Sequence, residues 1–418
     1  MKFGINTVDD FNIKGKTVLL RVDINQPVDK QKNELKDVTR IKGCVPTITE
    51  LAKKGAKLVI LAHQGSDIEY GNYYNLGLHA KALSEFAGIP VEYVPDVCGP
   101  YAQEKVRALQ EGDILLLDNV RFMAEEMTLF ETKLKLTRRQ QVKTQVVEKL
   151  APLADLFVMD AFAAAHRAQP TLTAFGELMP AAMGRLFEKE YGVLAEILQA
   201  PKKPLVFVLG GAKIQDAFLM MDKALAEGTA DKVLAGGLVG NVMLAAKGID
   251  IGKASLDFIL RNNLGEYIEK STRLLEKYSG KIISPLDLAY EDSVRHNVSI
   301  EQLPLNELFT DIGERTANVF AQEIKNAKTV FVNGPMGVFE KPLSEYGTRQ
   351  VWKALAETKA FTVLGGGDSV AATNKYSLAY KMGYICTGGG AMVRFLSGEE
   401  LPVIDALKHA AVKFGNER

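Results

Sequence analysis

The sequence contains little cysteine, histidine or tryptophan and carries no net charge. Its 418 residues include three cysteines, five histidines and one tryptophan, and Lys plus Arg equal Asp plus Glu at 51 each. Because no C-x-x-C pair occurs, a disulfide framework and a zinc ribbon are disfavoured, and a reducing intracellular setting is favoured. The histidines show neither H-x-H nor H-x-x-x-H spacing, which argues against a histidine metal site. The charge balance argues against a protein that coats nucleic acid or an anionic membrane.

Long hydrophobic runs are also missing. No window reaches the ~18 uninterrupted apolar residues of a membrane helix, and Met1–Asp10 has no apolar core of the signal-peptide type. We therefore expect a soluble, cytoplasmic protein with no membrane or nucleic-acid partner. The sequence leaves open whether this protein is a monomer or a homodimer.

Short apolar runs rich in β-branched residues alternate with helical patterns along the chain. Such runs are typical of parallel strands that are buried on both faces. So many strands require two sheets, and a chain of 418 residues is long enough for two domains. The expected strands are Thr17–Val22, Lys57–Ala62, Val91–Val94, Ile114–Leu117, Leu156–Met159, Leu205–Leu209, Lys232–Ala235, Lys281–Ser284, Thr329–Val332, Phe361–Leu364 and Tyr384–Thr387.

The boundary between the domains is expected between Pro170 and Pro204. Apolar residues from Met183 to Leu198 form one stripe at helical spacing, which is typical of a helix that joins two domains. A short helix inside one domain is the alternative. The charged stretch from Met123 to Lys149 is expected to be a solvated helical face rather than a binding arm.

Glycine-rich junctions follow five strands of the second half. Glycine after a strand lets the backbone approach a phosphate and leaves amides free at a helix N-terminus. One such loop could be only a tight turn, but five together indicate a nucleotide site. A Walker loop and a dinucleotide fingerprint are both incomplete, so dinucleotide chemistry is disfavoured. The junctions are Gly210-Gly211-Ala212-Lys213, Gly236-Gly237, Asn333–Gly337, Gly365-Gly366-Gly367-Asp368-Ser369 and Gly388–Gly390.

Three polar side chains near these junctions suit a magnesium nucleotide. Asp368 is expected to bind Mg²⁺, which prefers carboxylate and phosphate oxygens; an N-cap is the alternative. Lys213 is expected to neutralise phosphate charge; a surface lysine is the alternative. Glu340 is a candidate for accepting hydrogen bonds from ribose hydroxyls.

Arginines collect at strand ends in the first half. Arg21, Arg40, Arg121 and Arg167 lie there together with Asn25 and His63. The planar guanidinium suits phosphate and carboxylate, so these side chains predict an anion pocket; ordinary surface ion pairs are the alternative. No general base stands out. A carboxylate acceptor, with a pKa of roughly 4, is ionised at neutral pH and needs none.

With these motifs in order, the chain resembles the phosphoglycerate kinase family, most closely its archaeal branch. The resemblance spans essentially the whole length. The matching segments are Arg21-Val-Asp23-Ile-Asn25-Gln-Pro27, Asp37-Val-Thr-Arg40-Ile41, Asn119-Val-Arg121-Phe122, Asp160-Ala-Phe-Ala-Ala-Ala-His166-Arg167, Leu209-Gly-Gly-Ala-Lys213, Asn333-Gly-Pro-Met-Gly-Val-Phe-Glu340, Gly365-Gly-Gly-Asp368-Ser369 and Thr387-Gly-Gly-Gly-Ala391.

The resemblance implies an α/β fold of two Rossmann-like, doubly wound parallel-sheet domains, joined by a hinge and an interdomain helix. Residues 1–180, with a returning C-terminal segment of about 395–418, would form the acceptor domain, and residues 181–394 the nucleotide domain. The implied reaction is reversible, Mg²⁺-dependent phosphoryl transfer between ATP and the carboxylate of 3-phosphoglycerate, which gives ADP and 1,3-bisphosphoglycerate. This is a step of glycolysis and gluconeogenesis.

Site roles carry over from the family motif by motif. 3-Phosphoglycerate would bind Asp23, Asn25, Arg40, His63, Arg121 and Arg167, with position 66 also in this pocket. The nucleotide would bind Gly211, Lys213, Gly236, Gly237, Asn333, Pro335, Glu340, Gly365, Gly366, Gly367, Asp368 and Ser369, with Asp368 towards Mg²⁺. The transferring group would be stabilised by Arg40, Lys213, Gly366 and Gly389.

The chain departs from the family pattern in the acceptor pocket. After His63 the family usually has Gly-Arg-Pro, whereas this chain has Gln64-Gly65-Ser66-Asp67. Loss of one charge-assisted phosphate contact costs on the order of 1.5–3 kcal/mol. Two alternatives therefore stay open: a kinase of a different small carboxylate, and a nucleotide-binding relative without catalysis. Ala217, Arg394 and Val403 also replace common family residues.

Overall fold

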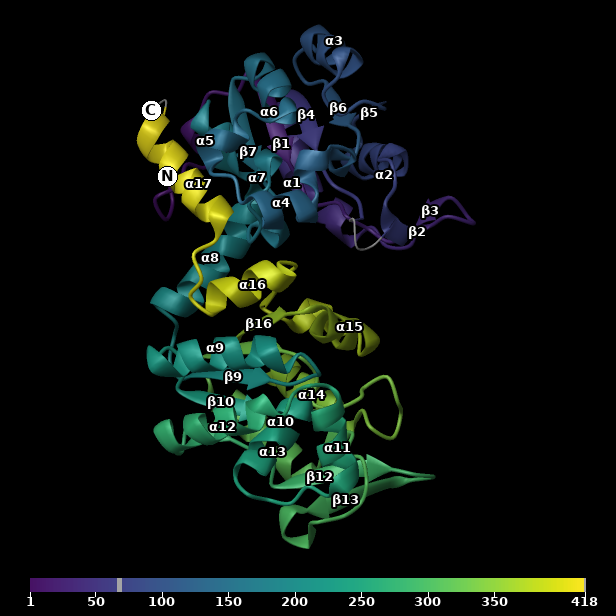
Figure 1. The fold of residues 1–418 in the computed structure, drawn as a ribbon, viewed down its shortest axis with the longest axis vertical. Coiled ribbons are helices and arrows are strands. Elements are labelled where there is room, and N and C mark those ends of the chain that lie inside the picture. The colour runs from purple at the N-terminus through teal and green to yellow at the C-terminus, as the bar shows by residue number, and fades with distance from the viewer. Residues whose placement is uncertain (66–69, 417–418) are drawn as a thin grey trace. The chain divides into compact units, whose positions relative to one another are not determined.

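The computed structural model describes residues 1–65 and 70–416. Its internal contacts divide the chain into two compact units, which Figure 1 shows in ribbon form. The first unit comprises Met1–Val193 and Glu400–Arg418, and the second comprises Leu194–Glu399. The division falls within helix α8 (Arg185–Gln199), in the stretch where the apolar stripe predicts a helix.

The first unit contains a six-stranded sheet in which all strands are parallel. The chain builds from β1 towards β4 on one side and later places β7 on the other side of β1. That reversal is the doubly wound arrangement, and ligands bind at the carboxyl edge of such sheets. The strand order is β5 (Glu92–Val94), β6 (Ile114–Leu117), β4 (Lys57–Leu61), β1 (Thr17–Arg21), β7 (Leu156–Met159) and β8 (Ala181–Met183).

Helices α1 (Thr39–Lys53) and α2 (Gly77–Ala87) bury their apolar sides against this sheet. Ile48 of α1 and Leu83 of α2 share one core with Leu20 of β1. Burying such a side chain stabilises the fold by roughly 1.5–3 kcal/mol. The remaining helices of the unit are α3 (Pro100–Ala108), α4 (Thr128–Leu134), α5 (Arg138–Gln141), α6 (Gln145–Leu150), α7 (Pro170–Thr173) and α17 (Pro402–Phe414).

The segment that the sequence analysis assigns to a solvated helical face is more varied than expected. It forms several short helices, and α6 buries Val146, Val147 and Leu150. Glu126 is completely buried and accepts hydrogen bonds from the backbone N–H and the hydroxyl of Thr171, both at 2.7 Å.

The C-terminal helix α17 belongs to the first unit. Its apolar side, which includes Leu407 and Ala410, packs against β8 and α7. Asn6 near the start of the chain donates to the carbonyl of Gly415, 2.7 Å away. The two ends of the chain therefore meet in the same unit.

The second unit also contains six parallel strands, wound in both directions from its first strand. Val206 and Val330 of its sheet share a core with Phe320 of α13 (Glu314–Asn326) and Trp352 of α14 (Tyr346–Glu357). The strand order is β11 (Ile282–Ile283), β10 (Lys232–Ala235), β9 (Leu205–Leu209), β15 (Thr329–Asn333), β16 (Phe361–Gly365) and β17 (Tyr384–Ile385). The prediction of two doubly wound parallel sheets is confirmed.

The other helices of the second unit are α9 (Ile214–Ala226), α10 (Gly237–Ala246), α11 (Lys253–Arg261), α12 (Glu266–Lys277), α15 (Gly367–Lys375) and α16 (Gly389–Leu396). Two small antiparallel sheets were not predicted. One pairs β2 (Val28–Asp29) with β3 (Glu34–Leu35). The other joins β12 (Asp287–Glu291) to β13 (Arg295–Ser299) and β14 (Asp311–Ile312).

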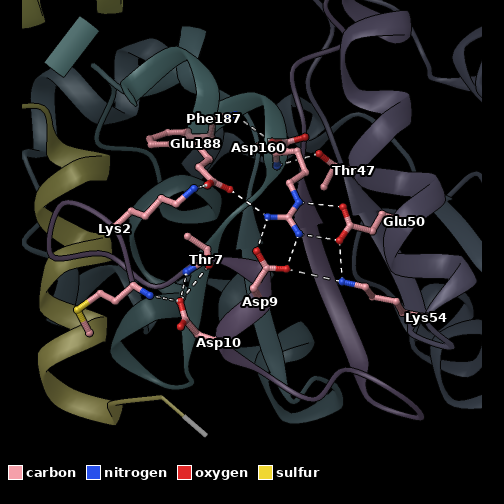
Figure 2. Close-up of polar contacts among 12 residues, drawn as sticks. Lys2, Thr7, Asp9, Asp10, Thr47, Glu50, Lys54, Asp160, Phe187 and Glu188 are labelled. Carbon is pink, nitrogen blue, oxygen red and sulfur yellow. Dashed lines mark hydrogen bonds and ion pairs between the residues drawn. The ribbon is translucent and has the colours of Figure 1, made fainter. Parts of the chain in front are cut away.

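An ion-pair network fixes the start of α8. The Arg185 guanidinium donates to both oxygens of Asp9 at 2.6 and 2.8 Å, to both oxygens of Glu50 at 2.7 and 2.8 Å, and to Glu188 at 3.1 Å. These carboxylates surround one guanidinium in Figure 2. The same figure shows Asp160, whose carboxylate accepts from the Phe187 N–H at 3.0 Å. The network joins α8 to Glu50 of α1, the helix that also carries Arg40.

We expect Arg185→Met to lower the free energy of unfolding by about 2 kcal/mol, because several charge-assisted hydrogen bonds are lost from a partly exposed site. Chemical denaturation measures this loss. The hydrogen bond from Arg185 lowers the pKa of Glu50 to about 2. The contribution is therefore present above the unfolded pKa of about 4.3 and disappears as pH falls towards 2. A wild-type-to-variant difference that persists undiminished at pH 2 would contradict this account.

None of the helices in residues 1–65 and 70–416 combines the length with the apolar composition of a membrane span. The side chains of the three cysteines are buried, and no disulfide joins them in the part of the chain that the structure describes.

Candidate functional site

In the first unit, the loops after four neighbouring strands converge at the carboxyl edge of the sheet. Asp23 and Asn25 follow β1, His63 follows β4, Arg121 follows β6, and Arg167 follows β7. Because these strands are adjacent and parallel, their ends lie side by side. The structure thus brings together most of the residues expected to bind an anion.

Direct contacts order this cluster. Arg40, at the start of α1, forms an ion pair with Asp23. Asn25 accepts a hydrogen bond from the Gly65 N–H at 3.0 Å, and Arg121 donates to the Gly65 carbonyl. The anion-binding candidates are therefore held in place before any ligand arrives, which lowers the cost of binding.

His63 lies in the field of four arginines. Its side chain is buried, and burial together with Arg21, Arg121, Arg40 and Arg167 holds its pKa well below the usual range. His63 is therefore neutral at physiological pH. The four arginines therefore make the surroundings of His63 electropositive.

Arg167 lies at the edge of the cluster. It donates to the Thr128 hydroxyl at 3.3 Å and lies 3.7 Å from a carboxylate oxygen of Glu131. Its side chain remains 30 % exposed, so it is accessible to a ligand.

Two of the four arginines are buried. The exposed fractions of Arg21 and Arg121 are 0 % and 3 %, whereas the side chains of Arg40 and Arg167 are partly exposed. Arg21 donates to the Thr171 hydroxyl, to the carbonyl of Val22 and to His63. That Arg21 belongs to an anion pocket stays a prediction.

The missing family arginine falls at position 66. This position, predicted to belong to the acceptor pocket, lies outside the described residues, as does Asp67. Lys42, two positions after Arg40, lies over the ring of Phe86, with 4.7 Å between Nζ and the ring centroid.

Sequence reasoning missed a buried amide network next to the arginine cluster. The Gln64 side chain donates to the carbonyls of Gln26 and Asn72 at 2.7 and 3.1 Å, and its oxygen accepts from the Gln26 N–H at 2.9 Å. The oxygen also contacts Nε2 of His79 at 3.0 Å. The side-chain amide of Gln26, in the orientation that satisfies both neighbours, donates to the Asp37 carboxylate and accepts from the Arg40 N–H. Glutamine between a strand and a loop carries no pattern that reveals such a role.

In the second unit, the glycine-rich junctions meet where the winding direction of the sheet reverses, between β9 and β15. The backbone N–H of Gly211 donates to the Pro335 carbonyl at 2.7 Å, and the Gly237 N–H donates to the Met336 carbonyl at 2.9 Å. The loops therefore touch backbone to backbone, which leaves no room for side chains between them.

A cavity of about 380 Å³ lies beside these loops. Five predicted nucleotide residues line it: Gly211, Gly237, Pro335, Glu340 and Asp368. Apolar residues that sequence reasoning missed complete its wall, namely Leu238, Phe258, Leu308, Phe309, Val338 and Phe339. A cavity with apolar walls and a few polar groups is typical of a small-molecule site.

A smaller cavity of about 140 Å³ lies at the N-termini of three helices. Lys213 precedes α9, Gly366 and Gly367 begin α15, and Gly389 begins α16. Asn333, Gly211 and Asp368 also line this cavity. Free backbone N–H groups and positive helix ends favour an anion there, particularly phosphate.

Three predicted nucleotide residues line neither cavity. Gly236 precedes α10 and Gly365 ends β16. Ser369 is buried, and its hydroxyl accepts from the Gly334 N–H at 2.8 Å. In this structure all three shape the loops rather than face the cavities.

The described residues contain no group of three or more His, Cys, Asp or Glu side chains that could hold a metal by themselves. Asp368 borders both cavities, and Asp216 borders the smaller one. This arrangement fits Mg²⁺, which usually takes one or two carboxylates and completes its shell with phosphate oxygens and water.

Comparison with known proteins identifies the family. The family model described as phosphoglycerate kinase matches residues 8–399. The chain is 42 % identical over 414 residues to the phosphoglycerate kinase of Methanobacterium bryantii, covering 99 % of each chain. It is 43 % identical to that of Methanococcus maripaludis, covering 97 % of this chain and 99 % of the relative. The crystal structure of phosphoglycerate kinase from Pyrococcus horikoshii matches with a TM-score of 0.88 and 38 % identity, over 98 % of this chain and all of that one. The chain therefore belongs to the phosphoglycerate kinase family of phosphotransferases.

Proposed function

We propose that the protein catalyses reversible phosphoryl transfer between ATP and the carboxylate of 3-phosphoglycerate, which yields ADP and 1,3-bisphosphoglycerate in the cytoplasm. Membership of the family along the whole chain supports this proposal. The structural observation that carries it is that each unit holds a candidate site for one of the two substrates. One unit has an arginine cluster around a neutral histidine, which suits the anionic acceptor, and the other has a glycine-lined cavity at three helix N-termini, which suits the phosphates of the nucleotide.

In this proposal the acceptor occupies the arginine cluster. Arg40, Arg121 and Arg167 supply charge for its phosphate and carboxylate, while Asn25 and His63 supply hydrogen bonds. Asp23 orients Arg40 through their ion pair. The attacking carboxylate is already ionised at neutral pH, so the reaction requires no general base.

The nucleotide occupies the second unit. The larger, apolar-walled cavity suits the base and ribose, with Glu340 near the ribose, and the smaller cavity suits the phosphates. Lys213 and the backbone near Gly366 and Gly389 would stabilise the negative charge on the transferring group, together with Arg40. Mg²⁺ held by Asp368 would supply further neutralisation of phosphate charge.

Transfer requires the two ligands to meet with water excluded, because water would hydrolyse ATP and the acyl phosphate. We propose that bending near α8 accompanies turnover.

A coupled assay with ATP and 3-phosphoglycerate tests the function directly, and a panel of other phosphorylated and plain acids tests the alternative acceptor. Turnover on another acid alone would replace the proposed substrate. Nucleotide binding without turnover on any acid would favour a non-catalytic relative. The comparisons offer no support for either alternative.

Restoring the missing cation at position 66 provides a sharper test. We expect Ser66→Arg to lower the KM for 3-phosphoglycerate by roughly tenfold or more, since one charge-assisted hydrogen bond contributes about 1.5–3 kcal/mol. Ser66→Gln is the matched control, because it adds length without charge and should have little effect. If Ser66→Arg leaves the KM unchanged while another acid is turned over faster, the acceptor is not 3-phosphoglycerate.

A further inference from the structure

The contact between Arg21 and His63 determines which form of the histidine is present. Arg21 ends β1, and His63 lies two residues after the end of β4, the neighbouring parallel strand. Nη2 of Arg21 lies 3.1 Å from Nδ1 of His63, and the guanidinium is completely buried. No solvent intervenes in a contact at this distance.

The chemistry of the two groups permits one assignment. A guanidinium has only hydrogen-bond donors, so Nδ1 of His63 must accept. A neutral imidazole with an accepting Nδ1 carries its proton on Nε2. A doubly protonated ring would place an N–H against the N–H of Arg21, which is repulsive. Burial lowers the pKa of Arg21 to about 10, so it keeps its charge at neutral pH.

The orientation of Arg21 is itself fixed from behind. Its Nε donates to the Thr171 hydroxyl at 3.2 Å, and that hydroxyl donates onward to Glu126 at 2.7 Å. Its Nη1 donates to the Val22 carbonyl at 2.5 Å. All these residues are buried. A continuous chain of hydrogen bonds therefore runs from Glu126 through Thr171 and Arg21 to His63.

We propose that Arg21 is a positioning residue that locks His63 as the neutral tautomer protonated on Nε2, so that His63 presents a hydrogen-bond donor to an oxygen of the anionic acceptor. This inference rests on the proposed function for the identity of the acceptor. The tautomer itself follows from the contact alone.

Nitrogen NMR of protein labelled with ¹⁵N-histidine tests the tautomer without any assay of turnover. Nδ1 and Nε2 have well-separated shifts when one is protonated and the other is not. The chain has only five histidines, and His63→Gln identifies the signal by its disappearance. We expect a protonated Nε2 and an unprotonated Nδ1 that do not change between about pH 5.5 and 8.5. A protonated Nδ1, or titration near the usual value of about 6.5, would overturn the proposal.

Variants connect the tautomer to binding. We expect Arg21→Met to mix the tautomers and raise the KM for 3-phosphoglycerate about tenfold, with the KM for ATP within about twofold.

Should Arg21→Met fail to fold, Thr171→Val removes the acceptor of Arg21 Nε with little change in shape, and Thr171→Ser retains it. Thr171→Val should shift the same two observables and Thr171→Ser should match the wild type. An equal rise in the KM for 3-phosphoglycerate and the KM for ATP would contradict the positioning role. Identical behaviour of Thr171→Val and Thr171→Ser would contradict it as well.

The two proposals fail separately. A protein with the Nε2–H tautomer but no turnover of 3-phosphoglycerate refutes the proposed function and leaves the Arg21 contact intact. An active kinase whose His63 is protonated on Nδ1 refutes the positioning role and leaves the proposed function intact.

Discussion

Replacing Arg40 with alanine is expected to lower kcat by two to three orders of magnitude while leaving the KM for ATP within about twofold. Losing one preorganised donor to developing charge typically costs a factor of this size. The variant also leaves the Asp23 carboxylate without its ion-pair partner, in the pocket where the anionic acceptor is proposed to bind. Steady-state kinetics with each substrate varied in turn measures both constants.

Two further variants make the Arg40 result specific. Arg40→Lys keeps the charge but loses the planar fork, so it should recover part of the lost turnover. Arg107→Ala removes an exposed arginine of α3 that donates to Gln103 at 3.3 Å, and it should change neither constant. A parallel loss of kcat and of ATP affinity in Arg40→Ala would show that the side chain does not act on the transferring group.

Gly334→Ala is expected to lower the free energy of unfolding by about 3 kcal/mol and to weaken ATP binding. The backbone at Gly334 has φ +91°, and an added Cβ would lie 2.2 Å from the Gly210 carbonyl oxygen. Strained backbone and overpacking each cost on the order of 1–3 kcal/mol. Because the loop before α9 must move to relieve the overlap, the phosphate cavity should be distorted as well. Chemical denaturation and ATP titration measure the two effects.

Gly367→Ala is the matched comparison within the same group of loops. A Cβ at Gly367 meets nothing within 4 Å, and its φ is negative. Its stability should therefore stay within about 0.5 kcal/mol of the wild type. Any loss of ATP affinity in this variant reports crowding of the ligand rather than damage to the fold. Equal stability of Gly334→Ala and Gly367→Ala would rule out the backbone contact as the reason for the glycine.

The architecture was predictable because it depends on local patterns. Fully apolar runs such as Ile114–Leu117 and Leu205–Leu209 became central strands with unchanged bounds. Glycine and arginine at strand ends were informative for a related reason. The loops that follow parallel strands all lie at the carboxyl edge of the sheet, so residues that follow adjacent strands lie close together in the site.

What the sequence did not reveal depends on contacts between distant segments. Arg21 and Arg40 both follow the rule for an anion-binding arginine, yet Arg21 is buried and Arg40 is partly exposed. The apolar wall of the larger cavity comes from separate segments around Phe258, Phe309 and Val338, and of these only Val338 lies in a motif that the sequence analysis quotes. The role of Gln64 depends on partners in three other segments. The spacing of apolar residues indicates which face of a helix or strand is buried. It does not indicate which distant residue packs against that face.

The meeting of both chain ends in the first unit has a consequence for biosynthesis. The second unit is one continuous segment, Leu194–Glu399, and it can form as soon as that segment leaves the ribosome. The first unit has all six strands of its sheet by residue 183, but it lacks α17 until residues 402–414 have been made. The surface of β8 and α7 that α17 covers therefore stays uncovered while the second unit is translated. A nonsense codon shortly after position 399 would leave the second unit intact, but the first unit would lack α17.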